Sequence, residues 1–226
     1  MQTRQLWLDL APKGGAYRRD TFVEGRSNAL ARKALKAWRE WPGGILALTG
    51  PMGCGKSHLA ALWAQENGGH KLELNNLPRN IQGCVLIEDL PEAMHEQNLF
   101  RLINNAAQGA VHVLLTSAVK PRQWPVHMPD LPSRLVAMHN VVIEEPDDVV
   151  LSGVLKKLFA DRQIAVDHAV IDYLLTRMER STAAALTTVE RIHAKGHDQR
   201  QNIRLPLVRA VMTQIEQEEH PNAQGK

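Results

Sequence analysis

The chain has 226 residues, of which 44% are apolar and 23% are charged, and its formal net charge is +3. This composition excludes a disordered chain and leaves room for one large domain or two small ones. There is no apolar run of about 18 residues and no signal-peptide core near Met1, so we expect a protein that is neither membrane-spanning nor secreted. Only Cys54 and Cys84 occur, which excludes a disulfide framework and favours the reducing cytoplasm.

The first forty residues contain an apolar tail and a basic segment. Leu6, Leu8 and Leu10 alternate with other residues, and a Pro/Gly linker follows at 12–15. This pattern fits an extended tail that docks in another protein's groove, and it fits an edge strand of the domain equally well. Residues 1–40 carry nine Lys/Arg against four Asp/Glu, which indicates either a nucleic-acid or acidic partner or an ordinary solvated face.

The next predicted elements enclose a glycine-rich loop. A helix capped by Ser27 or Asn28 is expected to end near Trp41. The apolar run 45–49 predicts a buried strand, and residues 57–66 have helical spacing. Between them, residues 50–57 read Gly-Pro-Met-Gly-Cys-Gly-Lys-Ser and match the phosphate-loop pattern G-x-x-x-x-G-K-[ST] at every fixed position.

Phosphate binding needs this strand, loop and helix context. The glycines allow consecutive backbone N–H groups to point at the phosphates, and the helix N-terminus adds partial positive charge. Lys56 is expected to reach the terminal phosphates and Ser57 to hold Mg²⁺. The predicted nucleotide-binding residues of this loop are Gly50, Pro51, Gly53, Cys54, Gly55, Lys56, Ser57 and His58.

Further strands are predicted at 71–74, 84–89, 111–116 and 141–143, with a helix at 96–107. Glu88 and Asp89 end the second of these strands, where a carboxylate can hold Mg²⁺ or orient an attacking water. Thr116 ends the next strand; its hydroxyl is either a γ-phosphate sensor or an ordinary strand-end group. The short spacing between Lys56 and Asp89 leaves little room for a full helix after the strand at 71–74.

From Pro146 onward the pattern is helical only, with four amphipathic segments and Asp147 and Asp167 as expected N-caps of the first two. The alternating strands and helices before it predict a parallel sheet with helices on both faces. We therefore expect three parts: a tail and linker at 1–15, an α/β domain at 16–146 and a helical domain at 147–226. His193 and His197 do not predict a metal site, because Gly196 argues against a continuous helix there.

Over its whole length, the chain resembles the AAA+ ATPases, and within them the group of the replication initiator DnaA and its shorter Hda (HdaA-type) relatives. The segment 22–28, Phe-Val-Glu-Gly-Arg-Ser-Asn, is similar to the part that packs on adenine, which implies nucleotide contacts for Phe22 and Val23. Residues 50–57 correspond to Walker A, Glu88 and Asp89 to Walker B, and Thr116 to sensor 1. The fold implied is a five-stranded parallel P-loop sheet flanked by helices and followed by a small all-helical lid.

Two arginines and the tail acquire expected roles from the same resemblance. Arg134, in the sequence Leu-Pro-Ser-Arg-Leu at 131–135, is similar to the arginine finger, which acts on nucleotide held by a neighbouring subunit. Arg180 corresponds to the sensor 2 arginine, although it can instead pair with a lid acid. Gln5, Leu6, Leu8 and Leu10 resemble the peptide by which Hda-like proteins bind the sliding clamp. The chain ends with the lid, so no sequence-specific DNA binding is expected.

The function implied is stimulation of ATP hydrolysis on the initiator DnaA, with the sliding clamp (the DNA polymerase beta subunit) as second partner and a homodimer left open. The protein itself would bind ADP or ATP, with Mg²⁺ on Ser57, Glu88 and Asp89. The order Glu then Asp at 88 and 89 departs from the family pattern, so we expect weak intrinsic hydrolysis. The alternatives are a helicase-loader-like ATPase that hydrolyses ATP on its own account, and direct DNA contact by the basic front.

Overall fold

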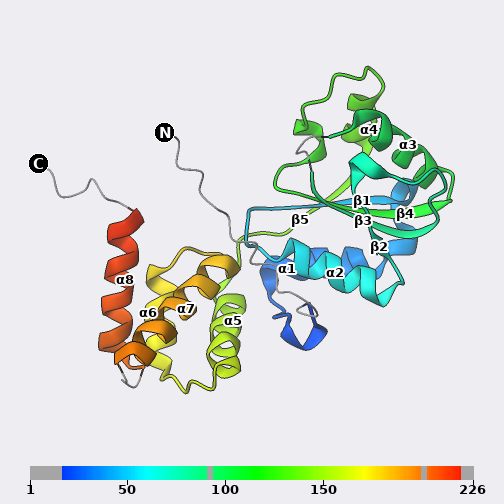
Figure 1. Cartoon of the computed structure of the whole chain (residues 1–226). Coiled ribbons are helices and arrows are strands. Elements are labelled where there is room, and N and C mark those ends of the chain that lie inside the picture. Colours follow the sequence, from blue (N-terminus) through cyan, green and yellow to red (C-terminus); the bar gives the residue numbers. More distant parts are fainter. Residues whose placement is uncertain (1–16, 91–93, 200–202, 220–226) are drawn as a thin grey trace, which may run out of the picture.

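A computed structural model describes residues 17–90, 94–199 and 203–219 (Figure 1). The predicted clamp-binding peptide at 5–10 lies outside these residues. The described chain forms one parallel sheet with helices on both faces, and a group of helices follows it in sequence and lies beside it in space. None of the described helices is both long and apolar enough to cross a membrane.

The sheet has five strands in the order β2-β3-β4-β1-β5, and every neighbouring pair is parallel. Its strands are β1 (Ile45–Thr49), β2 (His70–Lys71), β3 (Gly83–Leu90), β4 (Val111–Ser117) and β5 (His139–Val142). All five residues of β1 are buried, as expected for a strand between two others in a sheet covered on both faces. The predicted five-stranded parallel sheet is thus confirmed.

Helices α1 (Arg26–Lys36) and α2 (Lys56–Glu66) cover one face of the sheet, and α3 (Glu96–Ala107) and α4 (Leu131–Ala137) cover the other (Figure 1). Successive residues of β1 point to opposite faces, so Leu46 and Leu48 pack with the first pair of helices and Ile45 and Ala47 with the second. Two apolar cores therefore sandwich the sheet. Between β2 and β3, residues 72–82 hold only a 3-10 turn at Leu74–Asn76, which confirms the missing helix.

The C-terminal helices are α5 (Asp148–Asp161), α6 (His168–Arg177), α7 (Thr182–Gln199) and α8 (Leu205–Glu219). They pack around their own apolar core, in which Leu151, Leu155 and Phe159 are almost fully buried. The expectation that Gly196 interrupts the helix was wrong, because α7 continues through it. No group of three or more potential metal ligands occurs in the part of the chain that the structure describes.

The start of α1 differs from the prediction, because the helix begins at Arg26 with Gly25 as its N-cap. The Asn28 side chain accepts a hydrogen bond from the Gly25 backbone N–H, and the backbone N–H of Ser27 donates to the carboxylate of Asp147, 120 residues away. Asp147, at the start of the helical lid, therefore accepts the hydrogen bond of a free N–H group in the first turn of α1, for which the sequence predicted a nearby capping side chain. The same helix ends earlier than expected, at Lys36, and a 3-10 turn at Trp38–Glu40 follows it.

Two strands also differ in extent from the expected ones. β2 covers His70–Lys71 rather than 71–74, since the chain turns into the 3-10 segment Leu74–Asn76. β5 lies at His139–Val142 rather than 141–143 and pairs with β1 from Leu46 to Thr49. Both are edge strands, whose ends depend on pairing with a single neighbour.

Candidate nucleotide site

A cavity of about 540 Å³ lies between the glycine-rich loop and the helical lid. This volume is in the range of small-molecule and cofactor sites. Three parts of the chain form its main walls, and Asp89 on β3 and Thr182 on α7 also contribute to the lining. The lining residues used below are Tyr17, Thr21, Phe22, Val23, Gly53, Cys54, Gly55, Lys56, Ser57, His58, Asp89, Val150, Val154, Lys157, Leu158, Asp161 and Thr182.

The loop presents a helix N-terminus and a buried ammonium group. Helix α2 begins at Lys56, directly after Gly55, whose φ of 103° favours glycine. The Lys56 side chain is 9% exposed and donates hydrogen bonds to the carbonyl oxygens of Gly50 and Pro51, each at 2.8 Å. Because helix N-termini and oriented backbone N–H groups favour anions, this wall suits the phosphates of a nucleotide.

Cys54 fills space beneath the loop. Its side chain is buried, and burial raises the pKa of the thiol despite the nearby Lys56. A thiol with a raised pKa stays protonated at neutral pH and is a poor nucleophile. Cys54 therefore acts here as a small apolar residue that supports the loop.

Gly53 joins the loop to the lid. Its carbonyl oxygen accepts hydrogen bonds from the backbone N–H and the hydroxyl of Thr182, both at 2.8 Å. A Cβ atom at Gly53 would lie 2.7 Å from the Cβ of Ser181, and the φ of 72° is in the region that favours glycine. Gly53, which is at a variable position of the motif, thus serves the contact with α7. The sequence carried no signal for the role of Thr182.

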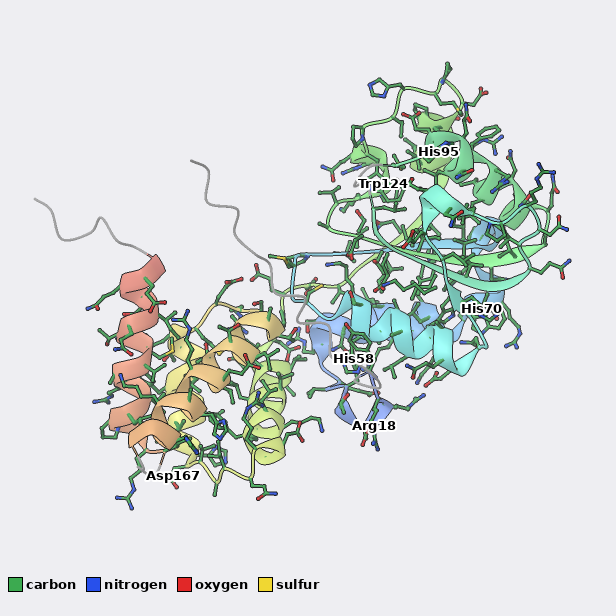
Figure 2. The ribbon with its side chains drawn as sticks, viewed as in Figure 1. Arg18, His58, His70, His95, Trp124 and Asp167 are labelled. Carbon is green, nitrogen blue, oxygen red and sulfur yellow. The ribbon has the colours of Figure 1, made fainter. Side chains whose placement is uncertain are left out.

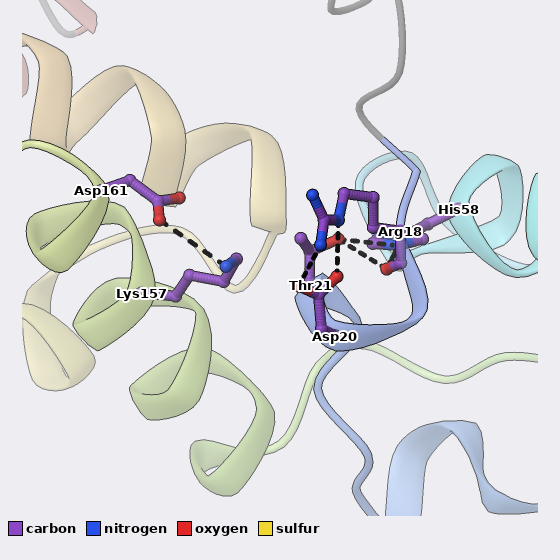
Figure 3. A network of polar contacts seen from close by, with 6 residues as sticks. All are labelled: Arg18, Asp20, Thr21, His58, Lys157 and Asp161. Atoms are coloured by element: carbon purple, nitrogen blue, oxygen red, sulfur yellow. Dashed lines mark hydrogen bonds and ion pairs between the residues drawn. The ribbon is translucent and has the colours of Figure 1, made fainter.

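The segment before α1 forms the second wall, around His58. The His58 ring packs edge-on against Phe22, and its Nε2 lies 3.2 Å from the hydroxyl of Thr21 and 3.1 Å from the carbonyl oxygen of Arg18 (Figure 3). Burial lowers the pKa of His58. Figure 2 places His58 at the end of α2 that faces the lid, with His70 at the opposite end. The predicted contacts Phe22, Val23 and His58 therefore share one wall.

Helix α5 supplies the third wall, which the sequence did not predict. Val150, Val154 and Leu158 make it apolar, as the flat face of a nucleobase requires. Lys157 and Asp161 form an ion pair at 3.6 Å and lie across from the Arg18–Thr21 segment (Figure 3). The cavity thus has a cationic end for phosphates and an apolar end for a ring.

Asp89 reaches the cavity through an irregularity in β3. Ile87 pairs with Leu115 and Leu90 with Ser117, so Glu88 and Asp89 together lie opposite Thr116. Asp89 has a φ of 59°, and its backbone N–H donates to the Thr116 hydroxyl at 3.1 Å. Such a bulge re-aims a side chain, and here Asp89 lines the cavity. Thr116 is fully buried and is not among the lining residues, so its hydroxyl supports the bulge.

Glu88 does not line the cavity. Its side chain is 11% exposed, Oε2 lies 2.5 Å from the Lys71 ammonium, and Oε1 is buried without a hydrogen-bond partner. Of the three predicted Mg²⁺ ligands, Ser57 and Asp89 lie in the cavity wall and Glu88 faces Lys71. The residues present do not fit a metal held by all three, because an ammonium group already neutralises one carboxylate.

Neither predicted arginine lines the cavity. On α4, Arg134 is half-buried: it donates to the Asn104 side chain at 2.7 Å and its guanidinium lies 4.5 Å from the ring centre of Phe100. On the lid side, Arg180 pairs with Asp148 at 2.7 Å and donates to the carbonyl oxygen of Pro146. The structure therefore shows the lid-acid pairing for Arg180, and the nucleotide roles of both arginines stay predictions.

No family model matches this chain. The chromosomal replication initiator protein DnaA of Lactobacillus johnsonii is 22% identical over 237 residues, covering 88% of this chain and 51% of that protein. The chain thus spans about half the length of this curated relative.

Among solved structures, domain III of the Thermotoga maritima replication initiation protein DnaA superposes with a TM-score of 0.73 at 16% identity, covering 88% of this chain and 96% of that one. A replication initiator DnaA bound to AMPPCP and single-stranded DNA gives a TM-score of 0.65 at 19% identity, covering 85% and 68%. The chain has the fold of DnaA domain III.

Proposed function

We propose that this protein is an Hda-like regulator of replication initiation. In this proposal the cavity binds ADP or ATP, residues 5–10 dock on the sliding clamp, and Arg134 acts on ATP held by the initiator DnaA. The protein then stimulates ATP hydrolysis on its partner and inactivates it. The cytoplasm is the compartment in which these partners meet.

One observation carries the proposal: the chain keeps its phosphate loop and Asp89 at the cavity, while Glu88, the other predicted acid, and Arg134 lie away from it. Lys56 and Ser57 line the cavity, but Glu88 is paired with Lys71 and Arg134 lies outside. Helix α4 covers the face of the sheet opposite α2 (Figure 1). Arg134 on α4 therefore cannot reach the chain's own cavity without a rearrangement. This division suits a protein that holds nucleotide for structure and supplies an arginine to another site.

The chemistry asked of Arg134 is electrostatic. A planar guanidinium can bind two phosphate oxygens at once and stabilise the charge that develops during phosphoryl transfer, and such fingers increase the rate by about 10³–10⁵. Asn104 and Phe100 would restrict its rotamers before it meets the partner. The adenine nucleotide is proposed on the fold, because a DnaA structure of the same fold contains AMPPCP.

The test measures ATP hydrolysis by ATP-loaded DnaA in the presence of clamp loaded on DNA. Wild-type protein is expected to accelerate hydrolysis, and Arg134→Ala to reduce that acceleration by about a hundredfold or more. Arg122→Ala is the matched control, because Arg122 is an exposed arginine twelve positions earlier in the chain. Equal acceleration by wild type and Arg134→Ala would exclude the finger, and no acceleration by either would exclude the inactivator function.

The clamp contact is tested separately. Leu6→Ala with Leu8→Ala is expected to abolish binding to immobilised clamp while leaving nucleotide binding unchanged. If the double variant binds the clamp as wild type does, residues 5–10 are not the docking peptide. The alternative function is that the protein hydrolyses ATP on its own account. It requires ATP turnover in the absence of DnaA, and Lys56→Ala must abolish that turnover.

A further inference from the structure

Glu88 is a largely buried carboxylate that forms an ion pair with Lys71. Its side chain is 11% exposed, and Oε1 is buried without a hydrogen-bond partner in the structure. A buried charge with unsatisfied oxygens is costly unless an opposite charge lies close to it. The contact between Glu88 Oε2 and Lys71 Nζ, at 2.5 Å, provides that charge.

The position of Lys71 follows from the sheet. β2 pairs in parallel with β3, and Lys71 lies opposite Leu86. Leu86 and Glu88 are two residues apart on one strand, so their side chains point to the same face, which is the face of α2. The four-carbon stem of Lys71 spans the remaining step along the strand, and its ammonium reaches the carboxylate.

The pair differs from an ordinary surface ion pair in its asymmetry. Lys71 is 65% exposed while Glu88 is mostly buried. Exposed pairs contribute little to stability, but removing the partner of a buried carboxylate leaves an uncompensated charge. Without Lys71, the carboxylate of Glu88 would be left without a counter-charge next to Asp89, which lines the cavity together with the phosphate loop.

We propose that Lys71 supplies, at the first Walker B acid, the positive charge that a divalent cation would otherwise bring, so that the cavity binds its nucleotide with little dependence on Mg²⁺. The lysine is a positioning residue, since it does not line the cavity and acts through Glu88. This inference rests on the proposed function only in taking an adenine nucleotide as the ligand. It does not depend on DnaA, the clamp or Arg134.

The experiment measures the affinity for a fluorescent ADP analogue in Mg²⁺ and in EDTA. Wild type is expected to differ by less than about threefold between the two conditions, and Lys71→Met to bind at least about tenfold more tightly in Mg²⁺, since the carboxylate of Glu88 would then have lost its ammonium partner and would need another cation. Lys71→Gln is a second neutral replacement should Lys71→Met fold poorly. Lys120→Met, which removes an exposed lysine elsewhere, is expected to behave as wild type.

A double variant isolates the pair. Adding Glu88→Gln to Lys71→Met is expected to abolish the new Mg²⁺ dependence, because the freed carboxylate is gone. Two results would overturn the proposal: wild type that requires Mg²⁺ for ADP binding, or neutral Lys71 variants that bind ADP equally in Mg²⁺ and EDTA. Failure of the proposed function has a different signature, namely no acceleration of DnaA hydrolysis or no ADP binding under any condition.

Discussion

His58 shows how one residue makes a wall of the cavity sensitive to pH. Its ring contacts Tyr17 and Phe22, with ring centres 5.2 Å apart in each pair, and its Nε2 lies near the Thr21 hydroxyl. Burial lowers the pKa of His58 below the ordinary value of 6.5, although the Arg18 carbonyl opposes this. The folded state therefore favours the neutral ring.

The pKa of His58 predicts a loss of stability in mild acid. As pH falls through about 6.5, the unfolded chain binds a proton at this residue that the folded chain does not, so the free energy of unfolding decreases. Above that pH the ring is neutral in both states and the effect is absent. Urea denaturation at pH 8 and pH 5.5 should show a smaller pH dependence for His58→Gln than for wild type. An identical pH dependence in the two proteins would contradict this assignment.

At the scale of elements, α5 approaches the segment before α1 closely enough to require glycine. A Cβ atom at Gly153 would lie 2.6 Å from Cγ1 of Val23, which lines the cavity. Gly153 is in a helix interior, where alanine would ordinarily stabilise by about 0.5–1 kcal/mol. Here the clash makes alanine destabilising instead, because Val23 and α5 must separate to admit the methyl group.

Gly153→Ala is therefore expected to destabilise the protein by about 1–3 kcal/mol and to weaken nucleotide binding by displacing a wall of the cavity. The neighbouring Ser152→Ala, on the same helix, should leave both nearly unchanged. Chemical denaturation and ADP titration of the two variants measure the effects. Tighter ADP binding or higher stability in Gly153→Ala would show that the contact is not a constraint.

At the scale of the whole molecule, a few polar contacts hold the lid against the α/β part. The carboxylate of Asp147 accepts hydrogen bonds from the backbone N–H of Ser27 at 2.9 Å and of Val150 at 3.0 Å, so it caps α5 and ties it to α1. Thr182 and Gly53 make the second joint. Burial raises the pKa of Asp147, but these hydrogen bonds outweigh it and the net pKa lies below 3.8.

Asp147→Ala is expected to cost about 1–3 kcal/mol, because it leaves two backbone N–H groups without an acceptor. The contribution of this carboxylate is present above pH 3.8 and is lost as pH falls through its lower folded pKa, so wild type and variant should converge in strong acid. Denaturation at pH 7 and pH 3 measures this difference, and the exposed Asp172→Ala is the control. A neutral effect at pH 7 would show that the joint contributes nothing.

The sequence by itself determined the features that are local in the chain. The strand, glycine loop and helix around Lys56 are contiguous, and the helix at 96–107 was predicted with its observed bounds. Regular alternation of strands and helices was enough to predict a parallel sheet and a helical lid, because hydrophobic periodicity reports directly on element type. Both N-cap positions, at Asp147 and Asp167, were also correct.

Only the tertiary structure decided what depends on residues far apart in the chain. The sequence contains no sign that Lys71 neutralises Glu88, that Asp147 caps α1 from 120 residues away, or that Thr182 binds Gly53 across 129. Each contact arises where strands or helices are brought together by burial of their apolar faces, and neither composition nor periodicity encodes which polar side chains then meet. The strand, glycine-rich loop and helix could therefore be predicted from their residues, whereas the Glu88–Lys71 ion pair and the cavity wall on α5 could not.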